Sequence, residues 1–451
     1  MAVIGTDSGL TGYDKFTKEF YMPGWSDLEN NQTTTVKFMR KRQVPFVGRR
    51  AVIALRVGRT AGVQAIAPSA IGQVSVGAAG LPTAGFQPVE NAFVLPCIIM
   101  LAIGIPQDTM DIAVADRGAF MDVLDFEMMG AKADAANYED KICYKGGSAT
   151  GLADITTGGT TTFVVDNYYP FFKSQKLAFY TSAGSFRGAS VVQSIARATR
   201  TITISPAVTT IAATDVVVTR GARPETATTA DLLTFEPWGF EPIISTTDPT
   251  LTSVDGQARY LGVLRTTYSE WQAQVVDCGG VFSYEKSQQV LDQISDESGG
   301  NANVAFTHKA TRRKIALKFA FGYAAEPTAA AVPTWKFNDT IRTEGGLVPR
   351  TEDEHGKDSM DWMRLNAEIP IVLDRYATHD FANNKGTIYF LDSRRWYEAI
   401  VTNWKFWAPE GRIFREAANT NSFGVVAHAY KFYQRVCDAP NTSGKLFNID
   451  T

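Results

Sequence analysis

The sequence predicts an α+β protein made of more than one packed lobe. Its 451 residues exceed the size of one average domain, so two or three lobes are expected. Apolar side chains recur at helical spacing over residues 116–147, and short β-branched runs fill residues 161–220. Helical and strand patterns are mixed in the rest of the chain, which is typical of an α+β architecture.

The composition is that of a globular protein with enough apolar material for a core. Hydrophobic residues make up 45% of the chain and charged residues 20%. The formal net charge of −3 excludes a strongly basic, DNA-condensing protein, so any contact with nucleic acid is expected to be local. The cysteines are scattered without a CxxC pair, which predicts reduced thiols in a cytosolic protein. They are Cys97, Cys143, Cys278 and Cys437.

No targeting or membrane segment is expected from the sequence. The first residues lack a basic region followed by an apolar run, so we expect no signal peptide. The longest apolar stretch, residues 92–106, is too short to span a bilayer and contains Pro96 and Gly104.

We expect residues 1–48 to form an N-terminal arm, because their periodicity is weak and their order would depend on neighbours. A basic cluster lies in this arm and just after it: Lys37, Arg40, Lys41, Arg42, Arg49 and Arg50. The cluster has two interpretations. One is contact with DNA or an acidic partner inside a shell; the other, which we favour, is salt bridges to another subunit or a solvated face.

Residues 60–89 run for thirty positions without one charged side chain. A soluble monomer rarely exposes such a surface, because contiguous apolar area drives association. The flanks, residues 51–57 and 92–103, predict paired strands. A flap of about fifteen residues per arm would reach roughly 50 Å. We expect it to lie across a neighbouring subunit; the alternative, a floppy Gly/Ala loop, would need more Ser, Lys or Glu to stay soluble.

A long amphipathic helix is predicted next. Its apolar positions recur at spacings of three and four. They are Phe120, Leu124, Met128, Ala131, Ala135, Tyr138 and Ile142. Asp116 can cap the start and Gly146–Gly147 can end the helix, giving a length of about 43 Å. The outer face is expected to carry Lys132, Asp134, Glu139, Asp140 and Lys141. We interpret this helix as a structural spine rather than a site.

Residues 152–223 predict a compact antiparallel β module inserted after that helix. Beyond it, Ser283 is a plausible N-cap for a helix that ends before Gly299–Gly300, and residues 309–320 predict a basic amphipathic helix. Strands are expected at residues 303–306, 368–375, 386–392, 396–402 and 425–436.

No motif for catalysis or metal binding emerges. The histidines have no metal-ligand spacing, and His428 is expected to be a core residue. They are His308, His355, His379 and His428. No phosphate-binding loop, nucleophile elbow or dinucleotide fingerprint occurs. We therefore expect no enzyme activity, no catalytic, cofactor-binding or metal-binding residue and no cofactor, although carboxylate sites leave no spacing signature and a β-rich enzyme stays an alternative.

Several segments, in their order along the chain, resemble the major capsid proteins of tailed bacteriophages, which have the Hong Kong 97-type fold. These segments are residues 80–93, 116–147, 151–155, 260–274, 385–400 and 429–449. The resemblance implies an N-terminal arm (1–48), an extended loop (49–110), the spine helix of the peripheral domain (111–151), a β-rich insertion (152–223), more peripheral domain (224–279), an axial domain (280–380) and closing strands of both domains (381–451).

The resemblance implies a structural subunit that self-assembles into hexamers and pentamers of an icosahedral shell around phage double-stranded DNA, through a procapsid that matures. The implied partners are further copies of the chain, a portal protein, a separate scaffolding protein, a decoration protein as a further candidate, and DNA in non-specific contact; no membrane is implied. The implied location is the virion, after assembly in the host cytoplasm.

One departure from the resemblance concerns crosslinking. Some capsids join their subunits by isopeptide bonds from a lysine on the extended loop, but no lysine occurs here between Lys41 and Lys132. Shell strength is therefore expected to be noncovalent. An encapsulin-like cellular nanocompartment shell, which has the same fold, is the nearest alternative.

Overall fold

The computed structural model describes most of the chain downstream of residue 32. The described residues are 33–44, 46, 50–59, 85–106, 117–225, 233–251, 258–320, 348–349, 360–363, 368–408, 413–416 and 424–451. They belong to one compact unit, Thr33–Thr451. Most of the expected arm, the centre of the uncharged segment and the expected cap Asp116 lie outside the described residues.

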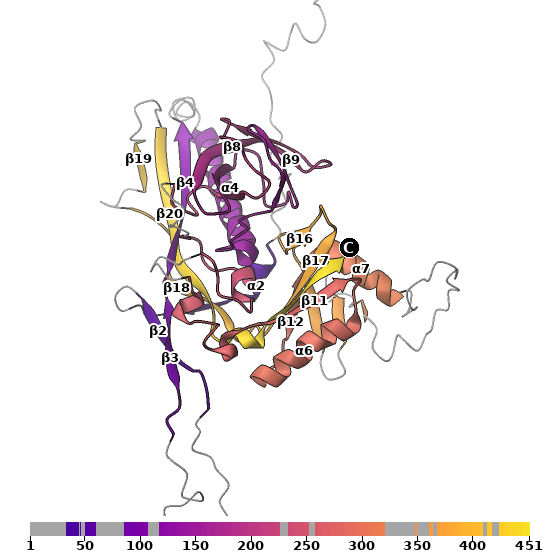
Figure 1. Cartoon of the computed structure of the whole chain (residues 1–451). Coiled ribbons are helices and arrows are strands. Elements are labelled where there is room, and N and C mark those ends of the chain that lie inside the picture. Colours follow the sequence, from indigo (N-terminus) through magenta and orange to yellow (C-terminus); the bar gives the residue numbers. More distant parts are fainter. Residues whose placement is uncertain are drawn as a thin grey trace, which may run out of the picture. The chain divides into compact units, whose positions relative to one another are not determined.

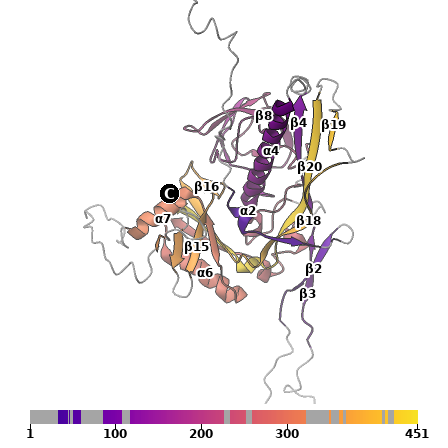
Figure 2. The ribbon, with the colours of Figure 1, turned by 180° about the vertical axis from the view of Figure 1, so that it is seen from behind.

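The predicted long helix is confirmed as α4, Arg117–Lys145, which is 29 residues long. It ends where the chain turns through Gly147, whose φ of +66° favours glycine. A Cβ on Gly147 would also lie 2.7 Å from Cε3 of Trp238, so the helix end packs too closely for any side chain. Figures 1 and 2 show α4 running beside strands β4 and β20.

The predicted polar face of α4 is wrong near its C-terminal end. Glu139, Asp140 and Lys141 are buried, whereas Met129 is 58% exposed. The helix is embedded on more than one side there, because short helices α2 (Thr35–Phe38) and α5 (Phe240–Ile243) contact it as well as β4. Helical periodicity alone assumes one buried face, so it misplaces charges that have partners inside the protein.

A five-stranded sheet lies against α4. Strand β20 (Gly424–Cys437) pairs with β18 (Trp396–Phe406), β19 (Phe414–Glu416) and β4 (Cys97–Pro106). Strand β1 (Arg40–Gln43) pairs with β18 in parallel and so joins the arm to the C-terminal part of the chain. The predicted strands at 396–402 and 425–436 are confirmed by β18 and β20.

The flanks of the uncharged segment are only partly paired as predicted. Strand β2 (Ala51–Arg56) pairs antiparallel with β3 (Val89–Val94), which confirms the expected hairpin. The prediction is wrong for the rest of the second flank, because β4 pairs with β20 instead. The physical reason is Pro96, which breaks the run between β3 and β4 and lets the two strands join different sheets.

The residues expected to form a β module make a six-stranded antiparallel sheet with the strand order β10-β7-β8-β9-β6-β5. The strands are β5 (Ile155–Thr157), β6 (Thr162–Val165), β7 (Lys176–Tyr180), β8 (Phe186–Ala196), β9 (Thr201–Ser205) and β10 (Val216–Thr219). Bridges from Gly151 and Asp154 to β10 join the two margins of the sheet. The sheet thus closes on itself around its own apolar cluster, which includes Phe163 and Phe179.

The second large sheet is mixed and has eight strands, with α6 (Tyr284–Ser298) and α7 (Lys309–Ala320) packed on it. Its strands are β11 (Gln274–Gly280), β21 (Gly444–Asp450), β17 (Lys385–Leu391), β12 (Val304–Thr307), β15 (Glu368–Leu373), β14 (Met360–Met363), β13 (Val348–Pro349) and β16 (His379–Asp380). Both predicted helices are confirmed, and Ser283 is the N-cap of α6, although its side chain makes no capping bond.

Three further one-turn helices connect these layers: η2 (Tyr260–Gly262), η3 (Ser269–Trp271) and η6 (Pro440–Thr442). The largest apolar cluster includes Tyr144 of α4, Trp238, Phe240 and Trp396 of β18, so it joins the spine helix to both large sheets. In the part of the chain that the structure describes, no helix is long and apolar enough to cross a membrane.

Candidate assembly interface

The hairpin of β2 and β3 forms a sheet of its own, with no third strand among the described residues. Its pairing sets Val52 opposite Phe93 and Arg56 opposite Val89. Side chains alternate between the two faces, as a strand requires. Val52 is 55% and Val89 is 62% exposed, and Phe86, just before β3, is 95% exposed. One face of the hairpin therefore presents apolar side chains to the surroundings.

The other face of the hairpin is fixed to the protein at its base. Ala92 and Val94 are buried in the largest apolar cluster. The Phe93 ring, which lies on the same face as Val52, is covered at the base by the Arg50 guanidinium, which lies 3.9 Å from the ring centre. At Gly262, which has a φ of +81°, a Cβ would approach Cδ2 of the same ring to 2.9 Å. The base is thus held by close contacts on both faces, while Val52 and Val89 on the outer face stay more than half exposed.

A two-stranded hairpin is marginally stable in water unless it packs against something else. Here only the base supplies packing, and the exposed apolar side chains farther along the outer face favour association. This arrangement suits a segment that is completed by contact with a second protein chain.

The beginning of the described chain is held by a buried hydrogen-bonded clamp. The Thr35 hydroxyl donates to Oδ2 of Asp374 at 2.6 Å and lies 2.6 Å from the Tyr144 hydroxyl. The backbone N–H of Val36 donates to Oδ1 of Asp140 at 3.1 Å. Thr35, Tyr144 and Asp140 are fully buried. Helix α2 is therefore tied to α4 and to the end of β15 by groups that are far apart in sequence.

The electrostatics of this clamp follow from its burial. Burial, and next the charge of Asp374, raise the pKa of Asp140 from 3.8 to about 9. Asp140 is then neutral at pH 7 and also makes a hydrogen bond with Asp374. A protonated Asp140 adds no negative charge to this buried site, so the clamp is stable at neutral pH and weakened by alkali.

A buried ion network joins α4 to the five-stranded sheet. Nζ of Lys431 lies 2.8 Å from Oε2 of Glu139 and 3.0 Å from Oε2 of Glu398. The Trp404 indole N–H donates to Oε1 of Glu139 at 2.6 Å. Removing one member of such a network leaves an unpaired buried charge, which is strongly destabilising. The network therefore fixes the position of the spine helix on the sheet.

The β module contacts the eight-stranded sheet through Phe381. Its N–H donates to the Asp166 carbonyl at 3.2 Å, and its carbonyl accepts from Nη1 of Arg200 at 2.6 Å. The rings of His308 and His379 lie 5.0 Å apart beside the Phe381 ring. Burial lowers the pKa of His308 to about 3 and that of His379 to about 4, so both are neutral at pH 7.

His308 and His379 therefore pack against Phe381 as neutral rings. No pattern in the sequence indicates that His308 and His379 meet, since only the fold brings them together. His428 is half-buried, not a core residue, because its strand has one open face; its ring lies 6.1 Å from that of Trp407. His355 lies outside the described residues. Across the described ranges, no three His, Cys, Asp or Glu side chains gather in a way that could hold a metal ion.

The cysteines are all free, as the scattered spacing predicted. Burial raises the pKa of the Cys97 thiol to about 12, and burial likewise raises the pKa of the Cys143 thiol well above its usual value. Both thiols are therefore protonated and poor nucleophiles at neutral pH.

No protein-family model and no curated protein sequence matches the chain. Among solved structures, the capsid asymmetric unit of cyanophage A-1(L) is similar over 97% of this chain and 98% of that chain, with a TM-score of 0.52 and 9% sequence identity. The fold is that of a phage capsid protein. It is the Hong Kong 97-type capsid fold that the order of the sequence segments resembled.

Two further solved structures are similar at lower scores. The capsid of a native GTA particle covers the whole of both chains with a TM-score of 0.46 and 9% identity. The Mycobacterium phage Adephagia structure covers 99% of both chains with a TM-score of 0.43 and 10% identity. At such identities the capsid fold is carried by packing and topology rather than by shared motifs.

Proposed function

We propose that the chain is the major capsid protein of a tailed bacteriophage, a shell subunit without enzyme activity. Its copies would form hexamers and pentamers that tile an icosahedral shell around double-stranded DNA. The observation that carries the proposal is the hairpin of β2 and β3, which is held by close contacts at its base and leaves Val52 and Val89 exposed on its outer face. The capsid fold supports it, because a shell places a neighbouring copy where that face needs cover.

In this proposal each lobe keeps the role that the resemblance implied. Residues 49–110 act as the extended loop, α4 as the spine helix and residues 152–223 as an insertion. The five-stranded sheet belongs to the peripheral domain and the eight-stranded sheet to the axial domain. The hairpin and the uncharged residues 60–84 lie across the adjacent copy, so that each subunit is held by the next.

The energetics of assembly fit this picture. Obligate interfaces commonly bury more than about 2,000 Å². At roughly 25 cal/mol per Å² of apolar surface this is a large favourable contribution, which the ordering of loop and arm reduces. Because a closed shell repeats each contact many times, individually weak contacts suffice. Shell strength is noncovalent, since the extended loop has no lysine.

The proposed partners are further copies of the chain, a portal protein, a separate scaffolding protein and the packaged DNA, which is contacted without sequence preference. A decoration protein is a further candidate. The proposed location is the virion, with assembly in the host cytoplasm.

Deleting residues 65–87 tests the proposal. The variant is expected to stay folded, because its base contacts are intact, but to form no particles in negative-stain electron microscopy. A matched control replaces the same residues by an equally long Gly/Ser linker, which keeps chain length and removes apolar surface; it is expected to fail as well. Normal particles from the deletion variant would contradict the proposed role of the hairpin.

A further inference from the structure

A patch of exposed positive charge lies where the arm meets the C-terminal strands. Its members are Arg40, Lys41 and Arg42 of β1 and Arg394 and Arg395 of the turn before β18. Arg40 pairs with Tyr397, two residues beyond that turn, so the strand and the turn adjoin. All four residues of β1 are exposed, although the Arg42 guanidinium lies over the Tyr397 ring, 5.3 Å from its centre.

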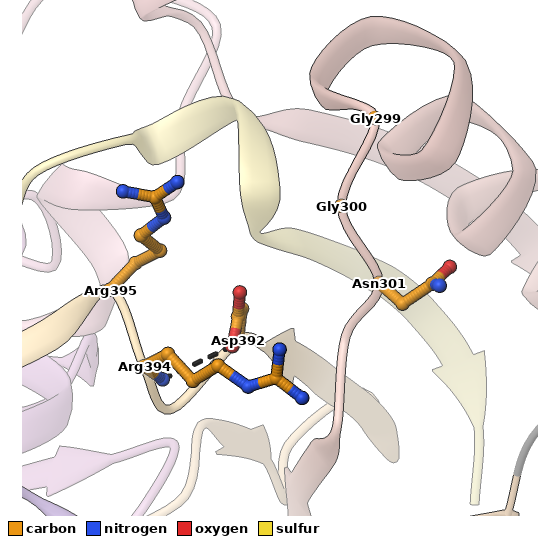
Figure 3. Close-up of a pocket in the computed structure, with 6 residues that line it drawn as sticks. All are labelled: Gly299, Gly300, Asn301, Asp392, Arg394 and Arg395. Atoms are coloured by element: carbon orange, nitrogen blue, oxygen red, sulfur yellow. Dashed lines mark hydrogen bonds between the residues drawn. The ribbon is translucent and has the colours of Figure 1, made fainter.

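The turn also lines a cavity of about 370 Å³. Its other walls are Gly299, Gly300, Asn301 and Asp392. Figure 3 shows the Arg394 side chain reaching from the turn toward Asn301, while Arg395 points the other way. The cavity thus has a guanidinium at its wall and room for an incoming side chain.

Two carboxylates of the same chain face the patch, and they do not balance it. Asp392 is buried and accepts the backbone N–H of Arg394 at 3.1 Å. Asp438 lies 3.8 Å from Nη1 of Arg395 and also faces Arg42. Among the described residues, five cations beside two carboxylates leave positive charge open to a partner, in a chain whose net charge is −3.

We infer that this basic patch binds the acidic face of helix α6 of a second copy of the chain. Glu285, Asp292 and Asp296 are exposed and lie seven and four residues apart, so they share one helix face. That face is opposite the buried Val290 and Ile294. Guanidinium groups bind carboxylates through paired, charge-assisted hydrogen bonds, which makes an acidic helix face a suitable occupant.

The inference rests on the proposed function, because a contact between two different surfaces of identical copies is needed only if the copies form a closed ring. Identical copies that meet head to tail around a closed ring must each present two different, complementary surfaces. The basic patch and the acidic face of α6 are such a pair. DNA is the competing occupant, but the net negative charge of the chain disfavours a polyanion and favours a second copy.

Charge reversal on each side tests the inference. The variants are Arg394→Glu with Arg395→Glu, Glu285→Lys with Asp292→Lys and Asp296→Lys, and all five substitutions together. Each reversal alone is expected to reduce particle yield at least tenfold at low salt, as measured by sedimentation and negative-stain microscopy. The combined variant restores opposite charges across the contact and is expected to regain most of the yield.

Three controls separate the outcomes. Lys173→Glu with Lys176→Glu reverses two exposed charges on the β module and is expected to assemble normally. Thermal melting of each unassembled variant checks that it is folded. Particle formation by the unchanged chain tests the proposed function separately, so its failure is distinguishable from failure of this contact.

Two results would overturn the inference. One is normal assembly of the arginine variant, including the case in which its particles have lost only their binding of a DNA duplex in a gel-shift assay. The other is a combined variant that remains folded yet assembles no better than either reversal alone.

Discussion

The β module and the hairpin of β2 and β3 are both antiparallel, yet they solve the burial of apolar side chains in opposite ways. The module closes its sheet through bridges to β10 and surrounds a cluster that includes Phe163 and Val217. The hairpin has two strands, a buried base and an exposed apolar face. The module is therefore stabilised by its own packing. The exposed apolar side chains of the hairpin, in contrast, would be buried only by contact with another chain.

The difference teaches where stability and assembly reside in this chain. Substitutions inside the module should destabilise it in the unassembled subunit as well as in the particle. Substitutions on the outer face of the hairpin should leave the subunit folded and act only when copies meet. The clamp at Thr35 is intermediate, because it holds the arm by a few buried hydrogen bonds.

The largest expected effect is in the module core. Phe163→Ala removes a ring that is 5.3 Å from Phe179 and 6.2 Å from Phe171, and should lower the free energy of unfolding by about 3–5 kcal/mol. Val52→Ala on the hairpin should change it by less than about 0.5 kcal/mol. Urea unfolding of unassembled subunits measures both. Equal losses of unfolding free energy in the two variants would contradict the difference between module and hairpin.

The next effect concerns assembly. Val52→Asp with Val89→Asp places charges on the outer face of the hairpin and is expected to reduce particle yield at least tenfold, because a carboxylate buried without a partner opposes the contact. The melting temperature of the free subunit should not change. Arg56→Asp, on the same face, is the control. It tests whether any added negative charge on this face reduces particle yield, or only one that replaces an apolar side chain.

A smaller effect is expected from pH at the arm clamp. The pKa of Asp140 is raised from 3.8 to about 9 by burial and then by Asp374, so the folded state keeps a proton that the unfolded state loses. The stabilisation is complete below pH 3.8 and decreases as the pH rises toward about 9.

Asp140→Asn is neutral at every pH and should remove this slope. Urea midpoints of the variant and the unchanged chain between about pH 5 and 8.5 measure it. Parallel curves for the two proteins would show that Asp140 is not the group responsible.

The smallest effect is at the base of the hairpin. Arg50→Gln removes the guanidinium over the Phe93 ring and should lower stability by about 0.5–1 kcal/mol, the value of an exposed cation–π contact. Amide exchange in β2 should become faster, with no change in the module. A Lys at this position, which keeps the charge, is expected to restore part of the protection.

Local sequence patterns predicted those helices and strands in which buried side chains recur at one regular spacing. Helix α4 ends at the predicted glycines, and α7 has the predicted bounds, because helical spacing and stop signals lie within the segment itself. The flank that contains Pro96 was predicted as one strand, since both halves are apolar. Only the tertiary pairing with β20 shows that they belong to different sheets.

The clamp and the ion network could not be predicted, because their members are remote in sequence. Thr35 and Asp374 are 339 residues apart, and Glu139 and Lys431 are 292 apart. Charged residues such as Glu139 and Asp140 look solvent-exposed until their partners are known. The apolar hairpin was predicted because it depends on the lack of charge over thirty residues, which is visible in one segment.

Hydrogen–deuterium exchange of Ala51–Arg56 and Val89–Val94 tests the central claim most directly, by comparing free subunits with assembled particles. We expect fast exchange for the outer hydrogen-bonding edges of both strands in the free subunit and strong protection after assembly, while the β module is equally protected in both states. Equal exchange of the hairpin in the two states would contradict the claim that a neighbouring copy completes it.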